Sequence, residues 1–340
     1  MNFMINYIFL FFILNSIFFI FLNKIAFYYN LYDLPDFKRK IHSKPIPLLG
    51  GLLIILNLFL ILILNSFYEN ILDKKFFTIP ISHLYMYLTL LFFFLLGFFD
   101  DKYQISPNKK LLLMIIFIIF LIYFDETVLL TKINFSFINY KLSFGVYSYP
   151  LTILCFMLFI NAFNMIDGIN GQAISYATFI FFLFLFNNIL MNFSILLIIS
   201  FLFYLILNFL NKTYLGDNGS LSIGFLIAYI FVKTNNISHG QIFYSDEIFL
   251  IMLIPGLELI RVAFTRMIKK LHPFSADSSH IHHILIKNIN FVKSYLIIQI
   301  LLIYPYIFYL ITKTFFISLC VSLVLYTFLI IFFNKKHLKN

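Results

Sequence analysis

Residues 83–103 read HLYMYLTLLFFFLLGFFDDKY, an apolar run that ends in two adjacent carboxylates, Asp100 and Asp101. A helix rises 1.5 Å per residue, so about 20 apolar residues cross the hydrocarbon core of a bilayer, which is roughly 30 Å thick. The whole chain repeats this pattern: 62% of its 340 residues are hydrophobic, 11% are charged, and the mean hydropathy is +0.97. Soluble domains carry about 25% charged residues, so the composition predicts an integral membrane protein.

The apolar runs predict an all-α fold with about eleven (ten or eleven) transmembrane helices. We place the spans at residues 2–23, 47–65, 83–99, 110–124, 148–166, 172–188, 192–210, 219–233, 246–264, 291–311 and 315–333. The first run lacks the basic start and the small-residue cleavage site of a signal peptide, so we expect it to be retained. Because no internal repeat divides the chain, we expect one polytopic domain over residues 1–340.

Positive charge predicts the orientation of these helices. Most of the 24 Lys and Arg residues fall in loops on one side of the predicted spans. Cytoplasmic loops carry an excess of Lys and Arg, so the N-terminus is predicted outside and the C-terminus in the cytoplasm. The same rule accounts for the net charge of +10, and we expect no nucleic-acid partner.

Polar residues are costly in a bilayer, so their placement points to function. They gather in five clusters that the predicted topology puts on the cytoplasmic side, at residues 33–51, 97–110, 161–171, 215–224 and 258–283. The first cluster is basic and rich in proline, and a juxtamembrane loop explains most of it.

The second cluster places Asp100 and Asp101 at the end of a span. Adjacent carboxylates repel each other, and the C-terminus of a helix already carries partial negative charge. Structure alone therefore does not favour them there, whereas a bound cation or a proton transfer would. The alternative is a solvated loop in which Ser106 caps the helix that contains Lys110.

The third cluster presents a polar face. If the helix continues, an arc of roughly 120° contains Asn161, Asn164, Asp167, Gly168 and Gly171. Glycine permits a ligand to approach the backbone closely. A plain loop after a helix is the alternative.

The fourth cluster, LGDNGSLSIG at residues 215–224, opens a helix with small residues and Asp217. Backbone amides at a helix N-terminus suit an anion, and a carboxylate suits Mg²⁺. A turn with a helix cap is the alternative.

The fifth cluster combines cations with histidines. It contains Glu258, Arg261, Arg266, His280, His282 and His283. Three histidines could bind zinc, but neighbouring arginines favour phosphate groups over a metal. Glu258 and Arg261, three residues apart, alternatively form an ion pair within one helix.

Together the clusters supply what phosphoryl transfer needs: carboxylates for Mg²⁺, amides, an anion site and a cationic loop. A lipid phosphate is the natural nucleophile for a site at the membrane. A transporter is the alternative from another class, but transporter sites lie near the bilayer midplane in repeat-related pairs. A membrane scaffold would not need Asp100, Asp101 or Asp217.

The clusters, in this order, resemble the signature of the polyprenyl-phosphate N-acetylhexosamine-1-phosphate transferases (glycosyltransferase family 4), a superfamily that includes phospho-N-acetylmuramoyl-pentapeptide translocase. The matching pieces are Asp100-Asp101 with Ser106-Pro107 and Lys110, Asn161, Asn164 and Asp167-Gly168, Gly216-Asp217-Asn218-Gly219-Ser220, and Pro273-Phe274 with Asp277, His280, His282 and His283. The His-Ile-His-His sequence resembles the bacterial branch that makes polyprenyl-diphosphate N-acetylglucosamine for surface polysaccharides such as O-antigen.

The resemblance implies transfer of N-acetylglucosamine 1-phosphate from a UDP-sugar to undecaprenyl phosphate, with release of UMP, at the cytoplasmic face of the bacterial inner membrane. It also allows a homodimer. The alternative donors are other UDP-amino sugars, such as UDP-N-acetylfucosamine or UDP-N-acetylmuramoyl-pentapeptide.

The resemblance further implies roles for individual residues. Mg²⁺, or Mn²⁺, would be held by Asp217 and Asn164, and the implied catalytic acids are Asp100, Asp101 and Asp167. Either Asp100 or Asp101 would deprotonate or orient the lipid phosphate. The implied substrate-binding residues are Lys110, Asn161, Asn164, Gly168, Arg261, Arg266, His280, His282 and His283.

Three positions depart from the family pattern. Asn170 stands where members usually carry the second acid of Asp-Gly-x-Asp-Gly, so the role of that charge is lost here or falls to Asp167. Leu48 and Ser278 stand where members commonly carry Arg. These changes bear on the identity of the donor more than on the reaction class.

Overall fold

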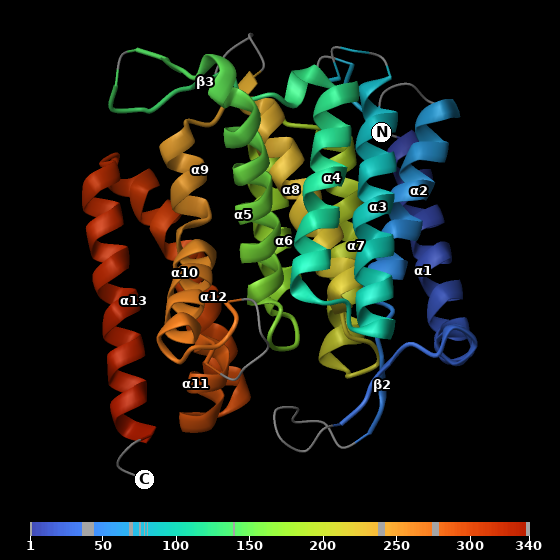
Figure 1. Cartoon of the computed structure of the whole chain (residues 1–340). Coiled ribbons are helices and arrows are strands. Elements are labelled where there is room, and N and C mark those ends of the chain that lie inside the picture. The colour runs from blue at the N-terminus through green and yellow to red at the C-terminus, as the bar shows by residue number, and fades with distance from the viewer. Residues whose placement is uncertain are drawn as a thin grey trace.

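Long helices lie side by side along a common direction in the computed structural model, joined by short connections at both ends (Figure 1). The structure describes residues 2–35, 44–67, 71–74, 76–77, 79, 81–138, 140–236, 242–273 and 279–337. Its helices are α1 (Asn2–Tyr29), α2 (Gly50–Phe67), α3 (Ser82–Tyr103), α4 (Pro107–Phe124), α5 (Ser148–Ile166), α6 (Gln172–Phe186), α7 (Met191–Phe209), α8 (Gly216–Asn236), α9 (Ser245–Ile251), α10 (Leu253–Ile268), α11 (Ile281–Asn288), α12 (Phe291–Thr312) and α13 (Phe315–His337).

The described connections contain little other regular structure. Two short 3₁₀ turns are η1 (Glu126–Val128) and η2 (Gly145–Tyr147). Two antiparallel pairs of two-residue strands are β1 (Tyr32–Asp33) with β2 (Ile46–Pro47), and β3 (Lys132–Ile133) with β4 (Leu142–Ser143). The apolar pattern predicted neither these strands nor the short helix α11.

Every predicted span overlaps a helix or, for residues 246–264, the consecutive pair α9 and α10. Among the described residues, eight helices are long and apolar enough to cross a membrane, and nine if the bent pair α9 and α10 forms one span. Helix α6 is apolar but only 15 residues long. The class of all-α membrane protein is confirmed, whereas the count of eleven and the orientation stay predictions.

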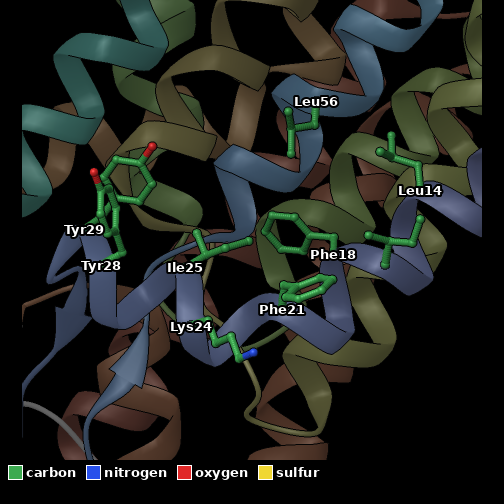
Figure 2. Close-up of a pocket in the computed structure, with 9 residues that line it drawn as sticks. Leu14, Phe18, Phe21, Lys24, Ile25, Tyr28, Tyr29 and Leu56 are labelled. Carbon is green, nitrogen blue, oxygen red and sulfur yellow. The ribbon is translucent and has the colours of Figure 1, made fainter.

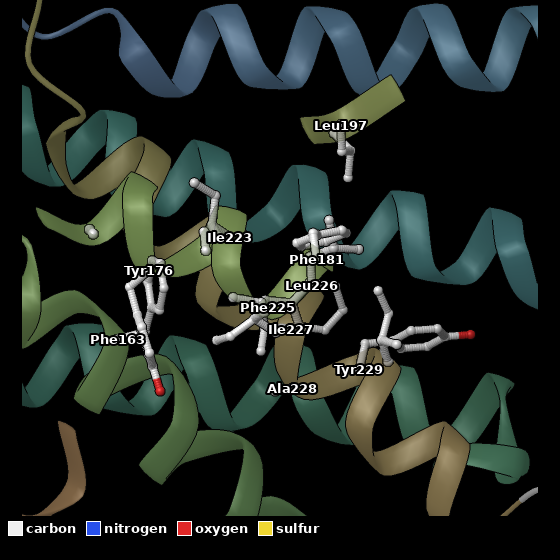
Figure 3. Close-up of a cluster of buried hydrophobic side chains, with 14 of the residues drawn as sticks. Phe163, Tyr176, Phe181, Leu197, Ile223, Phe225, Leu226, Ile227, Ala228 and Tyr229 are labelled. Carbon is white, nitrogen blue, oxygen red and sulfur yellow. The ribbon is translucent and has the colours of Figure 1, made fainter. Parts of the chain in front are cut away.

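Helix α8 forms the centre of the helix bundle. Its residues 218–234 are all buried, and it packs chiefly against α3 and α5. Figure 3 shows the side chains around it, including Phe163 of α5, Phe181 of α6 and Phe225 of α8 itself. Phe225 stacks on Phe93 of α3, with 5.0 Å between the ring centroids. A helix enclosed in this way offers its polar groups only at its ends.

Glycines let two helices reach the N-terminal turn of α8. A Cβ atom at Gly97 of α3 would lie closer than 3.0 Å to the carbonyl oxygen of Asp217 and to the backbone of Asn218. A Cβ atom at Gly51 of α2 would overlap Asn218 and the backbone nitrogen of Gly219 in the same way. Only glycine allows this approach, so these positions fix where the α8 N-terminus lies.

A bend of 63° separates α9 from α10. Pro255 has no N–H group, so it cannot bond the carbonyl of Ile251 four residues earlier, and the helix breaks at this point. The hydroxyl of Tyr176, on α6, donates a hydrogen bond to that carbonyl instead. The bend directs α10, with the acid and arginines of the fifth cluster, toward the end of the bundle that carries the C-terminus (Figure 1).

A buried cation joins three helices at the opposite end. Lys233 of α8 is 1% exposed, and its Nζ atom lies 3.1 Å from Asp125 Oδ2 at the end of α4. The same ammonium group donates to Ser82 Oγ of α3 at 2.8 Å and to the hydroxyl of Tyr229 at 3.0 Å. A buried ion pair of this kind is costly to break from one side only.

We therefore expect Lys233→Met to lower the free energy of unfolding in detergent by about 3–5 kcal/mol, because Asp125 would keep an uncompensated buried charge. The double variant Lys233→Met with Asp125→Leu is expected to recover most of that loss. Thermal unfolding of both proteins measures the difference. Equal stability of the single variant and the parent protein would show that the pair contributes nothing.

We also expect Gly97→Ala to separate α3 from the start of α8 and to lower the free energy of unfolding by about 1–3 kcal/mol. Gly256→Ala is the matched control, because a Cβ atom there meets no atom within 4 Å. The control is expected to be as stable as the parent or slightly more so. If both variants unfold alike, close approach at Gly97 is not needed.

Candidate active site

The described connections of the polar clusters meet at one end of the bundle, the end that carries the C-terminus (Figure 1). They come from the α1–α2, α3–α4, α5–α6 and α7–α8 connections and from the α10–α12 region. Residues 36–43 of the first cluster and residues 274–278 of the fifth lie outside the described residues. Asp277 and Ser278 are among them, so their predicted importance stays untested.

Three charged side chains from three helices form what we call the acidic centre: Asp100 of α3, Lys110 of α4 and Asp217 of α8. Lys110 Nζ lies 2.7 Å from Asp100 Oδ2 and makes a second, shorter ion pair with Asp217 Oδ2. The two carboxylates are also within hydrogen-bonding reach of each other. The lysine side chain is 15% exposed. An ammonium group held between two carboxylates compensates the repulsion between Asp100 and Asp217.

Asp101, the neighbouring acid, faces in a different direction. Its carboxylate accepts hydrogen bonds from the backbone N–H groups of Asp217 and Asn218, at 2.9 and 3.1 Å, and from the side-chain amide of Asn218. That amide also donates to the carbonyl of Leu48 at 3.1 Å. The anion at the N-terminus of α8 is therefore the carboxylate of Asp101, which fixes the helix end.

One of the two predicted asparagines of α5 reaches the acidic centre. Asn164 accepts a hydrogen bond from Ser220 Oγ and also bonds the carboxylate of Asp217. Asn161 donates to the carbonyl of Met157 in its own helix, at 2.7 Å. The structure thus brings Asn164 into the centre, whereas the side-chain amide of Asn161 bonds its own helix.

Asp167 follows the last residue of α5. Burial, and then the negative charge of Asp217, raise the pKa of Asp167 to about 7. This carboxyl group can therefore exchange a proton near neutral pH, as an acid or base in catalysis must.

Asn170 has a structural role that an acid could not fill. Its side-chain amide donates to the carbonyl of Asn208 at 3.1 Å and to Asn211 Oδ1 at 2.7 Å. A carboxylate has no hydrogen to donate, so Asp at this position would meet two oxygens without a bond. The contact joins the α5–α6 connection to the end of α7 and to the α7–α8 connection.

His282 lies against the α5–α6 connection, and the rings of His280 and His283 pack against it. A Cβ atom at Gly168 would overlap the ring of His282, so this glycine provides the space that the ring occupies. The rings of His280 and His282 are parallel within 7°, and those of His282 and His283 have centroids 4.3 Å apart. Burial and the neighbouring histidines hold the pKa of His282 well below its usual range, which keeps this ring neutral.

Both arginines of the fifth cluster bind protein groups. Arg261 pairs with Glu258 within α10, with 2.8 Å between Nη2 and Oε1, which confirms the ion pair predicted as an alternative. Arg266 donates to the carbonyl of Pro273 at 2.7 Å and lies 3.2 Å from His280 Nε2. A role of these arginines in holding substrate phosphates stays a prediction.

The acidic centre fits a divalent cation. Mg²⁺ is usually bound by one or two carboxylates together with waters and substrate phosphates. Asp100 and Asp217 already share one cation, the Lys110 ammonium, and the amide of Asn164 adjoins them. No group of three His, Cys, Asp or Glu residues in the described part of the chain converges as a complete metal site. The donor set therefore suits a metal that takes its remaining ligands from outside the chain.

Two hollows flank the C-terminal end of α1. A polar pocket of about 270 Å³ is lined by Asn30, Tyr32, Asp33, Leu34, Leu48, Asp101, Lys102 and Gln104, and thus adjoins the acidic centre. Figure 2 shows the other, an apolar groove of about 510 Å³ between α1 and Leu56 of α2. Lys24 is the one charged residue that lines the groove. Only the polar pocket has a carboxylate of the site in its wall.

Sequence patterns missed two groups that hold the site together. Tyr326 lies in an apolar run, and Asn208 ends another, and neither position carries a recognisable motif. Asn208 accepts from the N–H of Gly171 and donates to the carbonyl of Thr213 at 2.9 Å. Tyr326 donates to Glu258 at 2.6 Å. Both act across long sequence separations, which a local pattern does not record.

Comparison with known proteins agrees with this geometry. The family model described as glycosyl transferase family 4 matches residues 83–235, which contain the acidic centre. The undecaprenyl-phosphate alpha-N-acetylglucosaminyl 1-phosphate transferase of Escherichia coli K12 is 28% identical over 287 residues, covering 81% of this chain and 74% of its own.

Two further relatives extend the comparison. The protein of the same name from Yersinia pestis is 28% identical, over 83% of this chain and 75% of its own. A probable undecaprenyl-phosphate N-acetylglucosaminyl 1-phosphate transferase of Bacillus subtilis is 28% identical, over 76% and 71%. The family match falls on the helices that build the acidic centre, so residues 83–235 are similar to glycosyl transferase family 4 in the part of the chain that contains the candidate site.

Proposed function

We propose that this protein transfers N-acetylglucosamine 1-phosphate from UDP-N-acetylglucosamine to undecaprenyl phosphate and releases UMP. The observation that carries the proposal is the acidic centre, in which Asp100 and Asp217 share one cation at the end of a membrane helix bundle. The names of the relatives supply the acceptor lipid and the sugar phosphate. Another UDP-amino sugar remains the alternative donor.

Asp100 is the acid that meets the acceptor in this proposal. Its Oδ1 atom accepts from the N–H of Ile105 at 2.7 Å, which orients the carboxylate toward Lys110. Asp101 is committed to the backbone of α8 and acts by fixing Asp217. A phosphate oxygen of the lipid, oriented or deprotonated by Asp100, attacks the β-phosphorus of the donor, and the bond from that phosphorus to the UMP oxygen breaks.

Other residues hold the donor and manage charge. Mg²⁺, held by Asp217 with Asn164, would neutralise negative charge that builds up on the diphosphate. Asp167 exchanges a proton near neutral pH beside Asp217. The segment with His280, His282 and His283, in which His282 lies against Gly168, binds the donor phosphates and sugar. No covalent enzyme intermediate is needed.

The cellular setting follows from the same proposal. The protein is a multi-pass membrane protein. We infer that it resides in a bacterial inner membrane with the acidic centre at the cytoplasmic face, where UDP-sugars are made, and that it begins the synthesis of a surface polysaccharide. Assembly as a homodimer is part of the proposal.

UMP release by the purified protein in detergent tests the reaction. We expect release from UDP-N-acetylglucosamine only when undecaprenyl phosphate and Mg²⁺ are both present, because the acceptor supplies the nucleophile and the metal neutralises the diphosphate. A panel of UDP-amino sugars identifies the donor. Folded protein that releases no UMP from any donor would contradict the proposed reaction.

Asp100→Asn and Asp217→Asn are each expected to lower kcat about 100-fold or more, because an amide neither accepts a proton nor carries the charge that holds the cation. Glu126→Gln is the control, since Glu126 lies in η1 at the opposite end of the bundle. Unchanged membrane insertion shows that folding is intact. Near-normal turnover of either Asp variant would refute its role.

A further inference from the structure

A buried carboxylate, Glu258 of α10, gathers donors from three helices and is only 2% exposed. Arg261 donates to it from the next turn, with 2.8 Å between Nη2 and Oε1 and 3.1 Å between Nε and Oε2. The hydroxyl of Tyr326 donates to Oε2 at 2.6 Å, and the backbone N–H of Ile281 donates to Oε1 at 2.8 Å. A buried carboxylate needs such partners to remain charged.

These contacts fix the backbone on both sides of His280. Ile281, the first residue of α11, is bound through its N–H by Glu258. The carbonyl of Ser279 accepts from Arg261 Nη2 at 2.7 Å. His280 Nδ1 itself lies 3.5 Å from Glu258 Oε1. The Glu258–Arg261 pair therefore determines where the histidine segment begins.

Helix α13 supports the start of α11 through Glu258 and contacts the end of α11 directly. Tyr326 of α13 bonds Glu258 and also accepts from Arg261 Nε at 2.9 Å. At the other end of α11, the side-chain amide of Asn288 donates to the carbonyl of Phe333 at 3.2 Å. Helix α13 lies at the edge of the bundle (Figure 1), yet Tyr326 is 4% exposed. The buried hydroxyl links a peripheral helix to the site.

We propose that Glu258 and Tyr326 are positioning residues for the sugar-phosphate donor: they hold α11 so that its His282 ring lies against Gly168. This inference rests on the proposed function. Glu258 lies behind the histidine segment with its oxygens taken by protein donors, so it acts through that segment. The donor side of the reaction depends on the arrangement, whereas the acceptor side at Asp100 belongs to other helices.

Tyr326→Phe tests the proposal by removing one oxygen atom. We expect kcat/KM for UDP-N-acetylglucosamine to fall about tenfold, because a hydrogen bond to a charged group is lost. The KM for undecaprenyl phosphate is expected to change less than about twofold. Hydrogen exchange in residues 281–288 is expected to rise. Asn288→Ala, which frees the other end of α11, is expected to act in the same direction.

Ser322→Ala is the matched control. Ser322 is also a buried hydroxyl of α13, but within the described part of the chain it bonds only the carbonyl of Ser318 in its own helix, at 2.7 Å. A donor-specific loss in Tyr326→Phe with none in Ser322→Ala supports the proposal. Equal kinetics of the two variants, or equal losses for donor and acceptor in Tyr326→Phe, overturns it. If the parent protein releases no UMP, the proposed reaction has failed instead.

Discussion

Asp100 and Asp217 can lie side by side because the ammonium group of Lys110 is between them. Without a cation, two carboxylates in a poorly solvated place would repel each other or take up a proton. The lysine thus keeps the centre assembled, and the cation of the proposed reaction would meet carboxylates already in position. Pre-organisation of this kind lowers the reorganisation that the reaction requires. Three separate helices must be in register for it to exist.

That register is set by the first turn of α8. Asp101 binds the backbone N–H groups of this turn, and Gly97 and Gly51 allow α3 and α2 to touch it directly. The two adjacent acids therefore have different roles: Asp101 binds the N-terminus of α8, and Asp100 pairs with the Lys110 ammonium group. Adjacent residues of a helix point in different directions. Asp100 can therefore face Lys110 while Asp101 faces the first turn of α8, because both stand in the last turn of α3.

The sequence predicted the helical membrane class and the residues of the acidic centre, because apolar runs and isolated acids carry strong signals in a membrane protein. It predicted the Glu258–Arg261 pair because that contact is local. It did not predict that α8's own amides bind Asp101, that Asn170 is needed as a donor, or that Tyr326 supports the histidines. Those features are contacts between residues far apart in the sequence, and spacing along the chain does not show which distant residues will meet. The break at Pro255 was likewise hidden inside one apolar run.

The buried cation at the far end of α8 has a consequence for how the chain is made. Under the predicted orientation, the ammonium group of Lys233 must cross the hydrocarbon during insertion, and an unaccompanied charge is expensive there. Asp125, which receives it, precedes it in the chain, as does Ser82. The N-terminal helices are synthesised first, so the acceptor groups are already in the membrane when α8 arrives. The order of synthesis along the chain thus places the groups that compensate the Lys233 charge in the membrane before the lysine itself is inserted.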